Sequence, residues 1–299
     1  MKVLVTGGAG YVGCVLVKAL RNFGHSVVVY DNLMYGGQGL LGVIGCPKVE
    51  FIEGDARDRV KVENAALGCD LIIHLAAIVG YPACDLSSSR TRTTNYDAVF
   101  AIRDLGIPII FASTQSVYGQ QSGVVDESTY RRPQTSYAEY KMYAENILLE
   151  GGDNVVFRFP TLFGVSPRMR WDLLVNDFTQ RAVLDGTLVV YQPDAIRPIL
   201  HVADAVSFYL MAVDGKFAPG VYNVGHDDLV ITKRQLCMEI AQYVNLDVTF
   251  KEFATDKDQR DYRIDFSKLD FSPSRSLGAG IRELVKAVPL TRERKWRNA

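Results

Sequence analysis

The sequence of 299 residues lacks three features that would each point to a particular class of protein. Its 33 basic and 34 acidic residues leave a formal net charge of −1, so bulk charge attracts neither nucleic acid nor an anionic membrane. No apolar run reaches the ~20 residues of a membrane-spanning helix. The five cysteines include no C-x-x-C pair, which argues against a disulfide framework and a zinc site. We therefore expect a cytoplasmic globular protein without a metal, and with neither nucleic acid nor membrane as a partner.

Short apolar runs alternate with helical patterns through the first 160 residues. The runs predict strands at 2–6, 26–30, 49–53, 71–77, 107–112 and 154–159. Helices are predicted at 12–22, 60–67 and 96–105. This alternation is typical of an α/β fold with a parallel, doubly wound (Rossmann) sheet, in which ligands bind at the carboxyl ends of the strands.

The first strand runs directly into a glycine-rich turn, Gly7-Gly8-Ala9-Gly10-Tyr11-Val12-Gly13, and a helix follows. Glycines allow the backbone to approach a pyrophosphate, and a helix N-terminus offers free N–H groups and the positive end of its dipole. Asp31 ends the second strand, where dinucleotide folds bind a ribose diol through a carboxylate. Because that carboxylate would repel a 2′-phosphate, the pattern favours NAD over NADP.

Tyr137 and Lys141 are four residues apart, a spacing that brings two side chains together on one helix face. A nearby ammonium favours the phenolate, so such a pair can supply a base near neutral pH. The alternative is an ordinary exposed helix face. Thr114, at the end of a predicted strand, is a candidate hydroxyl partner, although a strand-end hydroxyl can also serve the backbone.

These motifs, together with Gly54-Asp55 and His74-Leu75-Ala76-Ala77, resemble the extended short-chain dehydrogenase/reductases, the family of NAD-dependent nucleotide-sugar epimerases and dehydratases. The resemblance extends over residues 1–270 and implies NAD as cofactor, a nucleotide-sugar substrate and a homodimer. It implies that Thr114, Tyr137 and Lys141 are catalytic. The implied cofactor-binding residues are Gly7, Gly10, Tyr11, Val12, Gly13, Asp31, Asn32, Asp55, Ala56, Leu75, Ala76, Ala77, Tyr137, Lys141 and Pro160.

The second half of the chain is less regular and has no linker peptide. We expect it to contribute an interleaved, smaller substrate domain from residues 165–198 and 226–299, whereas residues 1–164 and 199–225 bind NAD. Arg197 and Arg260 resemble the family's diphosphate-binding arginines, whose guanidinium forks suit an anion. For Arg168, Arg170 and Arg263, a solvated surface is the alternative. The predicted substrate-binding residues are Thr114, Gln115, Ser116, Thr161, Arg168, Asn176, Arg197 and Arg260.

Gln115 and Ser116 follow the candidate catalytic threonine, where dehydratases of this family carry an Asp-Glu pair. The resemblance implies oxidation at C4 of the sugar. Because neither Gln115 nor Ser116 transfers protons at neutral pH, we expect that oxidation to end as 4-epimerisation or net 4-dehydrogenation. The segments 31–34, 166–179 and 260–262 resemble a branch that includes GDP-linked heptose 4-dehydrogenases. Thr161 stands where hexose 4-epimerases usually have asparagine. A nucleotide-sugar dehydratase and a non-catalytic NAD(H)-binding module remain alternatives.

Overall fold

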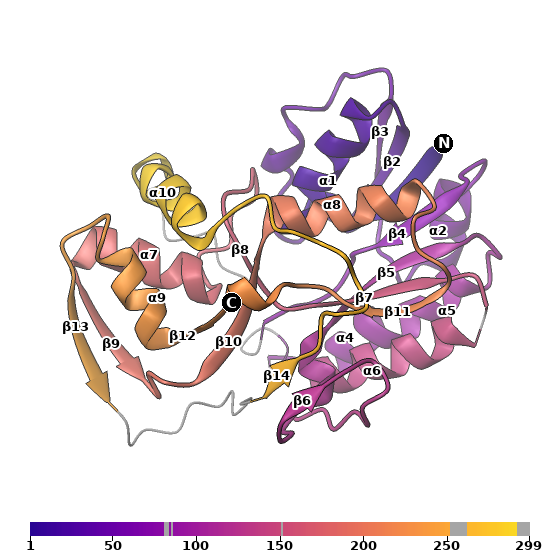
Figure 1. Ribbon diagram of the computed structural model, residues 1–299. Helices are drawn as coiled ribbons and strands as arrows, with labels where there is room; N and C mark the ends of the chain where they lie inside the picture. The colour runs from indigo at the N-terminus through magenta and orange to yellow at the C-terminus, as the bar shows by residue number, and fades with distance from the viewer. Residues whose placement is uncertain (81–83, 85, 151, 252–261, 292–299) are drawn as a thin grey trace.

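The computed structural model describes residues 1–80, 84, 86–150, 152–251 and 262–291. A parallel seven-stranded sheet lies at its centre, in the order β11-β7-β5-β4-β1-β2-β3 (Figure 1). Its strands are β1 (Lys2–Thr6), β2 (Ser26–Asp31), β3 (Val49–Glu53), β4 (Leu71–His74), β5 (Ile109–Thr114), β7 (Val155–Phe159) and β11 (Gly220–Asn223). The predicted doubly wound α/β fold is confirmed.

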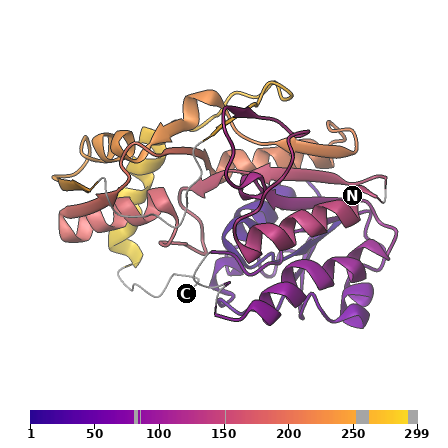
Figure 2. The ribbon, with the colours of Figure 1, turned by 90° about the horizontal axis from the view of Figure 1, so that it is seen from below.

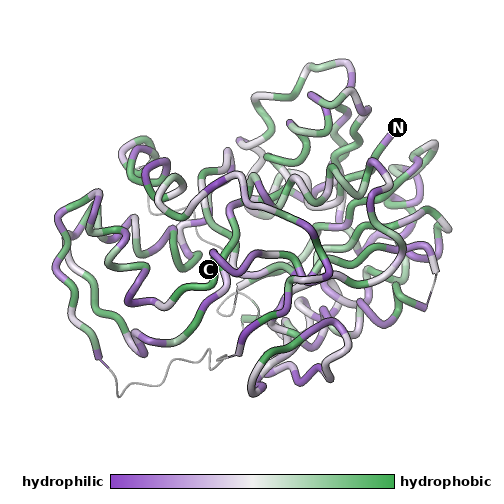
Figure 3. The backbone as a smooth tube through the Cα atoms, in the orientation of Figure 1, coloured by the Kyte–Doolittle hydropathy of each residue, from purple (hydrophilic) through white to green (hydrophobic). Residues whose placement is uncertain are grey.

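Helices cover both faces of this sheet because successive strand residues point to opposite faces. Val3 and Val5 belong to one core cluster with α1 (Tyr11–Asn22) and α8 (Val202–Val213), whereas Leu4 belongs to another on the opposite face. There α2 (Arg59–Ala65), α5 (Ala98–Arg103) and α6 (Ser136–Leu149) lie side by side (Figure 2). The strands of the central sheet, between the two helical layers, are mostly hydrophobic (Figure 3).

Several predicted boundaries differ from the structure. The predicted helix at 96–105 begins earlier, with α4 (Ser88–Arg92) capped by Ser87 and continued through a π-helical turn at Thr93–Asp97 into α5. The polar, β-branched residues of that stretch hide the helix from an apolar pattern. β5 extends to Thr114, beyond the predicted end at 112, so Thr114 occupies the end of the strand itself.

A smaller region lies beside the carboxyl ends of the central strands (Figure 1). Its described residues form one sheet of β8 (Thr161–Phe163), β10 (Ile196–His201) and β12 (Val230–Thr232), and another of β9 (Thr187–Tyr191) and β13 (Asp247–Lys251). They also form α7 (Leu174–Asp185), α9 (Lys233–Ile240) and α10 (Leu277–Ala287). A further two-stranded sheet pairs β6 (Val124–Val125) with β14 (Arg263–Ile264).

The two regions share one hydrophobic core rather than packing as separate units. A single cluster extends from Val3 in β1 to Trp171 and Leu284, all fully buried. In the three-stranded sheet of the smaller region, β8 and part of β10 come from residues that the sequence analysis assigned to the NAD-binding part. The described helices include none long and apolar enough to cross a membrane.

Candidate active site

A cavity of about 330 Å³ opens at the carboxyl ends of β1, β2, β4, β5 and β7. Every residue predicted to bind the cofactor lines it, including the base candidate Tyr137 and Lys141. Four of the predicted substrate residues line it too, and these are Thr114, Ser116, Thr161 and Arg168. The fold thus brings residues from positions 7 to 168 together around one cavity. The structure places them together without assigning their roles.

The glycine turn leaves a groove that side chains would close. Gly7 has a φ of +72°, and a Cβ there would lie 2.6 Å from the backbone nitrogen of Ala76. A Cβ on Gly13 would lie 2.4 Å from the carbonyl oxygen of Gly7. Gly10 caps α1 without a side-chain hydrogen bond, which leaves N–H groups of the first turn facing the cavity. This backbone fits a dinucleotide pyrophosphate.

Asp31 stands at the end of β2 beside this turn. Its two carboxylate oxygens accept hydrogen bonds from the backbone N–H groups of Ala9, at 3.0 Å, and Leu33, at 2.8 Å. Burial raises the pKa of Asp31, and the two N–H groups oppose that rise. Asp55 lies nearby, where hydrogen bonds from Arg57 hold its pKa well below the usual range. Both carboxylates therefore present acceptors of the kind that a ribose diol or an adenine amine needs.

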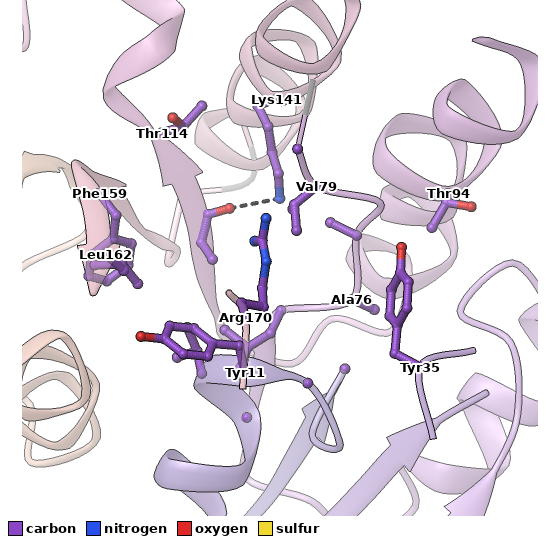
Figure 4. Close-up of a pocket in the computed structure, with 18 of the residues that line it drawn as sticks. Tyr11, Tyr35, Ala76, Val79, Thr94, Thr114, Lys141, Phe159, Leu162 and Arg170 are labelled. Carbon is purple, nitrogen blue, oxygen red and sulfur yellow. Dashed lines mark hydrogen bonds between the residues drawn. The ribbon is translucent and has the colours of Figure 1, made fainter. Parts of the chain in front are cut away.

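Helix α6 carries the candidate base. Thr135 caps it by accepting a hydrogen bond from the N–H of Ala138 at 3.2 Å, and Tyr137 follows in the first turn, packed against Ile78 and Cys84. Lys141, one turn later, is buried and donates to the carbonyl oxygen of Ala112 at 2.8 Å (Figure 4). Burial lowers the pKa of Lys141 to about 8. The ammonium is therefore charged at neutral pH but easily deprotonated.

Thr114 lies across from this helix at the end of β5. Its hydroxyl accepts a hydrogen bond from the N–H of Ser116 at 3.1 Å and donates to the Ser116 hydroxyl at the same distance. This supports in part the interpretation of Thr114 as a hydroxyl that serves the backbone. Because the residue also lines the cavity, its oxygen remains within reach of a ligand.

A buried ion pair beneath the site fixes α6 to the sheet. Glu145, one turn after Lys141, is fully buried and lies 2.7 Å from the guanidinium of Arg158 on β7. Ser113, which precedes Thr114, also donates to Glu145. These contacts join the helix of Tyr137 to the strand of Thr114. The sequence alone gave no reason to pair these residues.

Three predicted substrate residues lie outside the main cavity, and the fourth cannot be placed. Gln115 is buried and donates to the carbonyl oxygen of Val224 at 2.9 Å. Asn176 is also buried, accepting from the N–H of Gly164 and donating to a backbone carbonyl, so it serves the protein interior. Arg197 lines a separate cavity of about 10 Å³ with Gln115 and Thr161. Arg260 lies outside the described residues.

Of the three arginines for which a solvated surface was the alternative, only Arg263 is exposed. Arg168 is buried and Arg170 is mostly buried, and both line the main cavity. Arg170 points into it and pairs with Asp172 at 2.5 Å (Figure 4). The surface interpretation is therefore wrong for Arg168 and Arg170.

Sequence reasoning also missed other cavity residues. Met34, Tyr35, Val79 and Gly80 directly follow strands β2 and β4, a position that could have indicated them. Tyr30, Ala112, Ser113 and Phe159 lie at the carboxyl ends of β2, β5 and β7 and share that signal. Thr94, Leu162, Leu173 and Tyr209 come from segments with no local signal. Within the described part of the chain, no three His, Cys, Asp or Glu side chains gather as a metal site would require.

Comparison with known proteins agrees with this arrangement. The glycan biosynthesis protein Agl12 of Haloferax volcanii is 29% identical over 95% of this chain and 97% of its own length. DesIV, a dTDP-glucose 4,6-dehydratase of Streptomyces venezuelae solved with NAD and TYD bound, is 26% identical over 99% of both chains, with a TM-score of 0.85. The UDP-glucuronic acid 4-epimerase of Bacillus cereus, solved with UDP-glucuronic acid and NAD, shares the fold, with a TM-score of 0.86 at 22% identity over 97% of this chain and 99% of that one.

The family model described as "NAD dependent epimerase/dehydratase family" matches residues 3–225, well over half of the chain. The resemblance read from the motifs is thereby confirmed, as is NAD as the cofactor of the family. The glycine turn, the carboxylate at the end of β2 and the helix that carries Tyr137 and Lys141 all lie within the matched residues. The chain belongs to the NAD-dependent epimerase/dehydratase family.

Proposed function

We propose that this enzyme oxidises C4 of a nucleotide sugar with NAD and ends as a 4-epimerase or a net 4-dehydrogenase. The observation that carries the proposal is the arrangement of Thr114, Tyr137 and Lys141 around one cavity that also contains the glycine turn. When bound there, NAD supplies a hydride acceptor. The protein has to remove the proton from the sugar hydroxyl and hold the oxygen in place.

Tyr137 is the proposed base. It takes the hydroxyl proton, and the hydroxyl of Thr114 orients the same oxygen by hydrogen bonding. Lys141 favours the phenolate electrostatically while its own charge is compensated by the Ala112 carbonyl and the ring of Phe111, 4.5 Å away. The buried Glu145 holds α6 against β7 through Arg158 and against β5, the strand of Thr114, through Ser113.

The fate of the ketone depends on which acids and bases reach the sugar. Among the described residues that line the cavity, the acidic ones are Asp31 and Asp55, both at the end that fits the adenosine. Gln115 is turned into the protein, and Ser116 is a weak acid. Elimination of water needs an acid and a base beside the sugar, so this composition favours a ketone that is kept or reduced again.

We propose that the substrate is held by the smaller region, residues 165–198 and 226–299. Thr161 lines both the main cavity and the small cavity that contains Arg197, and so connects the reacting end with a guanidinium. The resemblance of segments 31–34 and 166–179 to heptose 4-dehydrogenases makes a GDP-linked heptose the first substrate to try. A homodimer, also implied by the resemblance, can be tested by analytical ultracentrifugation.

Incubation with a panel of GDP-, UDP-, CDP- and dTDP-sugars tests the proposal. Absorbance at 340 nm follows reduced nicotinamide, and NMR identifies the product sugar. Accumulating NADH with a keto sugar identifies a dehydrogenase, and a stereoisomer without NADH identifies an epimerase. A 4-keto-6-deoxy product would instead establish the dehydratase alternative, and NAD binding without turnover on any sugar would favour the regulatory module.

A further inference from the structure

The segment 164–173 belongs to the smaller region but is attached to the glycine turn of the larger one. The hydroxyl of Tyr11, the first residue of α1, donates to the carbonyl oxygen of Gly164 at 2.7 Å. The hydroxyl of Ser166 donates to the carbonyl oxygen of Tyr11 at 2.6 Å. These reciprocal bonds hold the segment against the N-terminus of α1, and Arg168 projects from it.

Arg168 is a buried cation that lacks a counter-ion. The residue is 3% exposed, and its guanidinium lies over the ring of Tyr35, 4.6 Å from the centroid. Its Nε has no hydrogen-bond partner, and the guanidinium forms no ion pair or hydrogen bond with the residues that the structure describes. Arg170, two residues later, differs because it pairs with Asp172. A buried unpaired charge is costly, and accordingly burial lowers the pKa of Arg168.

The base of the Arg168 side chain packs beside the first turn of α1. A Cβ on Gly39 would lie 2.3 Å from the sulfur of Cys14 and 3.2 Å from the Cβ of Arg168, so these three residues are packed together. Cys14 lies in the first turn of α1, directly after the glycine turn. An anion at the free N–H groups of that turn would therefore have Arg168 beside it.

We propose that Arg168 binds the pyrophosphate of NAD and is thus a cofactor residue, rather than the substrate contact expected from the sequence. Its guanidinium, buried, unpaired and facing the cavity beside the N-terminus of α1, supplies the positive charge that the glycine turn lacks. Asp31 is not its partner, since both carboxylate oxygens accept backbone N–H groups and no ion pair joins the two. The same carboxylate disfavours a 2′-phosphate as the anion. This assignment rests on the proposed binding of NAD in the cavity.

The test compares ligands on wild-type protein, Arg168→Gln and Arg168→Lys by isothermal titration calorimetry. We expect Arg168→Gln to raise the Kd of NAD and of ADP-ribose about 10- to 100-fold, as for a lost charge-assisted hydrogen bond, while the Kd values of GDP and UDP change less than threefold. Arg168→Lys keeps the charge without the fork and should lose less affinity. Without ligand, Arg168→Gln should melt no lower than wild type, because it removes an unpaired buried charge.

Arg181→Gln is the matched control, since Arg181 is a partly exposed arginine on α7 that pairs with Asp177 at 3.6 Å. It should leave all four Kd values unchanged. The assignment is overturned if Arg168→Gln binds NAD as wild type does, or if it weakens only GDP and UDP. Should Arg168→Gln fail to fold, Arg168→Lys carries the comparison alone, and unchanged NAD affinity in it overturns the assignment. Wild-type protein that binds no NAD would refute the proposed function itself.

Discussion

The two sides of the cavity are built from different kinds of groups. On the side of β1, β2 and β4, the surface consists of the glycine turn and of residues at or after strand ends, and a Cβ added at Gly7 or Gly13 would collide with backbone. On the side of residues 159–173, the surface includes the side chains of Arg168 and Arg170, which reach the cavity from a segment between sheets. The first surface is set by the positions of strands, and the second by how individual side chains pack.

This difference suggests which changes each side tolerates. A surface made of backbone gives the same cofactor groove whatever the substrate, whereas exchangeable side chains can adapt to different sugars. Substitutions on the strand-end side should therefore affect NAD binding or the chemical step. Substitutions on the other side should affect the nucleotide sugar, with Arg168 as the proposed exception.

The largest effect is expected from Tyr137→Phe, which removes the proposed base on α6. Turnover should fall about 10²- to 10⁴-fold while the Kd of NAD stays within about threefold. Stopped-flow measurement of nicotinamide reduction provides the rate. Tyr143→Phe, on the same helix but with its hydroxyl bonded to Glu139, is the control and should retain activity. Survival of turnover in Tyr137→Phe would show that another group accepts the proton.

Lys141→Met tests whether burial on α6 has lowered the pKa of Lys141. Because burial lowers the pKa of Lys141 to about 8, the folded protein releases its proton before the unfolded chain does. The unfolded chain binds more protons between pH 8 and about 10.5, so wild-type stability should rise with pH across that window, by roughly 3 kcal/mol. Below pH 8 the full cost of the buried charge is present.

Urea denaturation of wild type and Lys141→Met at pH 7 and pH 10 measures this change. The advantage of the methionine variant at pH 7 should shrink at pH 10, whereas the exposed Lys48→Met should show no such dependence. An advantage that is equal at both pH values would mean that Lys141 titrates normally in the folded protein.

Asp31→Ala tests the cofactor end of the strand-end side. Loss of the carboxylate should raise the Kd of NAD about 10- to 100-fold and reduce the preference over NADP, because the repulsion of a 2′-phosphate disappears. Fluorescence titration with both dinucleotides measures the two constants. Glu53→Gln, an exposed carboxylate at the end of β3 and outside the cavity, is the control. Unchanged NAD affinity in Asp31→Ala would refute the ribose contact.

The smallest effect is expected from Arg197→Ala, in the separate small cavity of the smaller region. It should raise KM for the nucleotide sugar about tenfold, with the Kd of NAD unchanged, because the small cavity of Arg197 is separate from the glycine turn. Steady-state kinetics and NAD titration provide the two values. A selective loss of NAD affinity would remove the distinction between the two sides of the cavity.

Local sequence was sufficient to predict the strand-end side of this site. The glycine turn, Asp31, Asp55 and the Tyr137–Lys141 spacing all depend on where a strand ends or on the helical period, and both can be recognised within a few residues. Parallel pairing then brings the strand ends together without any further information. The fold class follows from the same alternation of strands and helices.

Only the tertiary structure decided the rest, because burial and pairing arise between residues far apart in the chain. Asn176 had a plausible role in the sequence, yet it lies in the interior, bonded to Gly164 and Arg170. Arg168 and Arg170 are two residues apart in the same segment, but Arg170 pairs with a carboxylate whereas Arg168 lies over the ring of Tyr35. Whether an arginine is solvated, paired or poised for an anion depends on what the fold packs against it, and no local pattern encodes that environment.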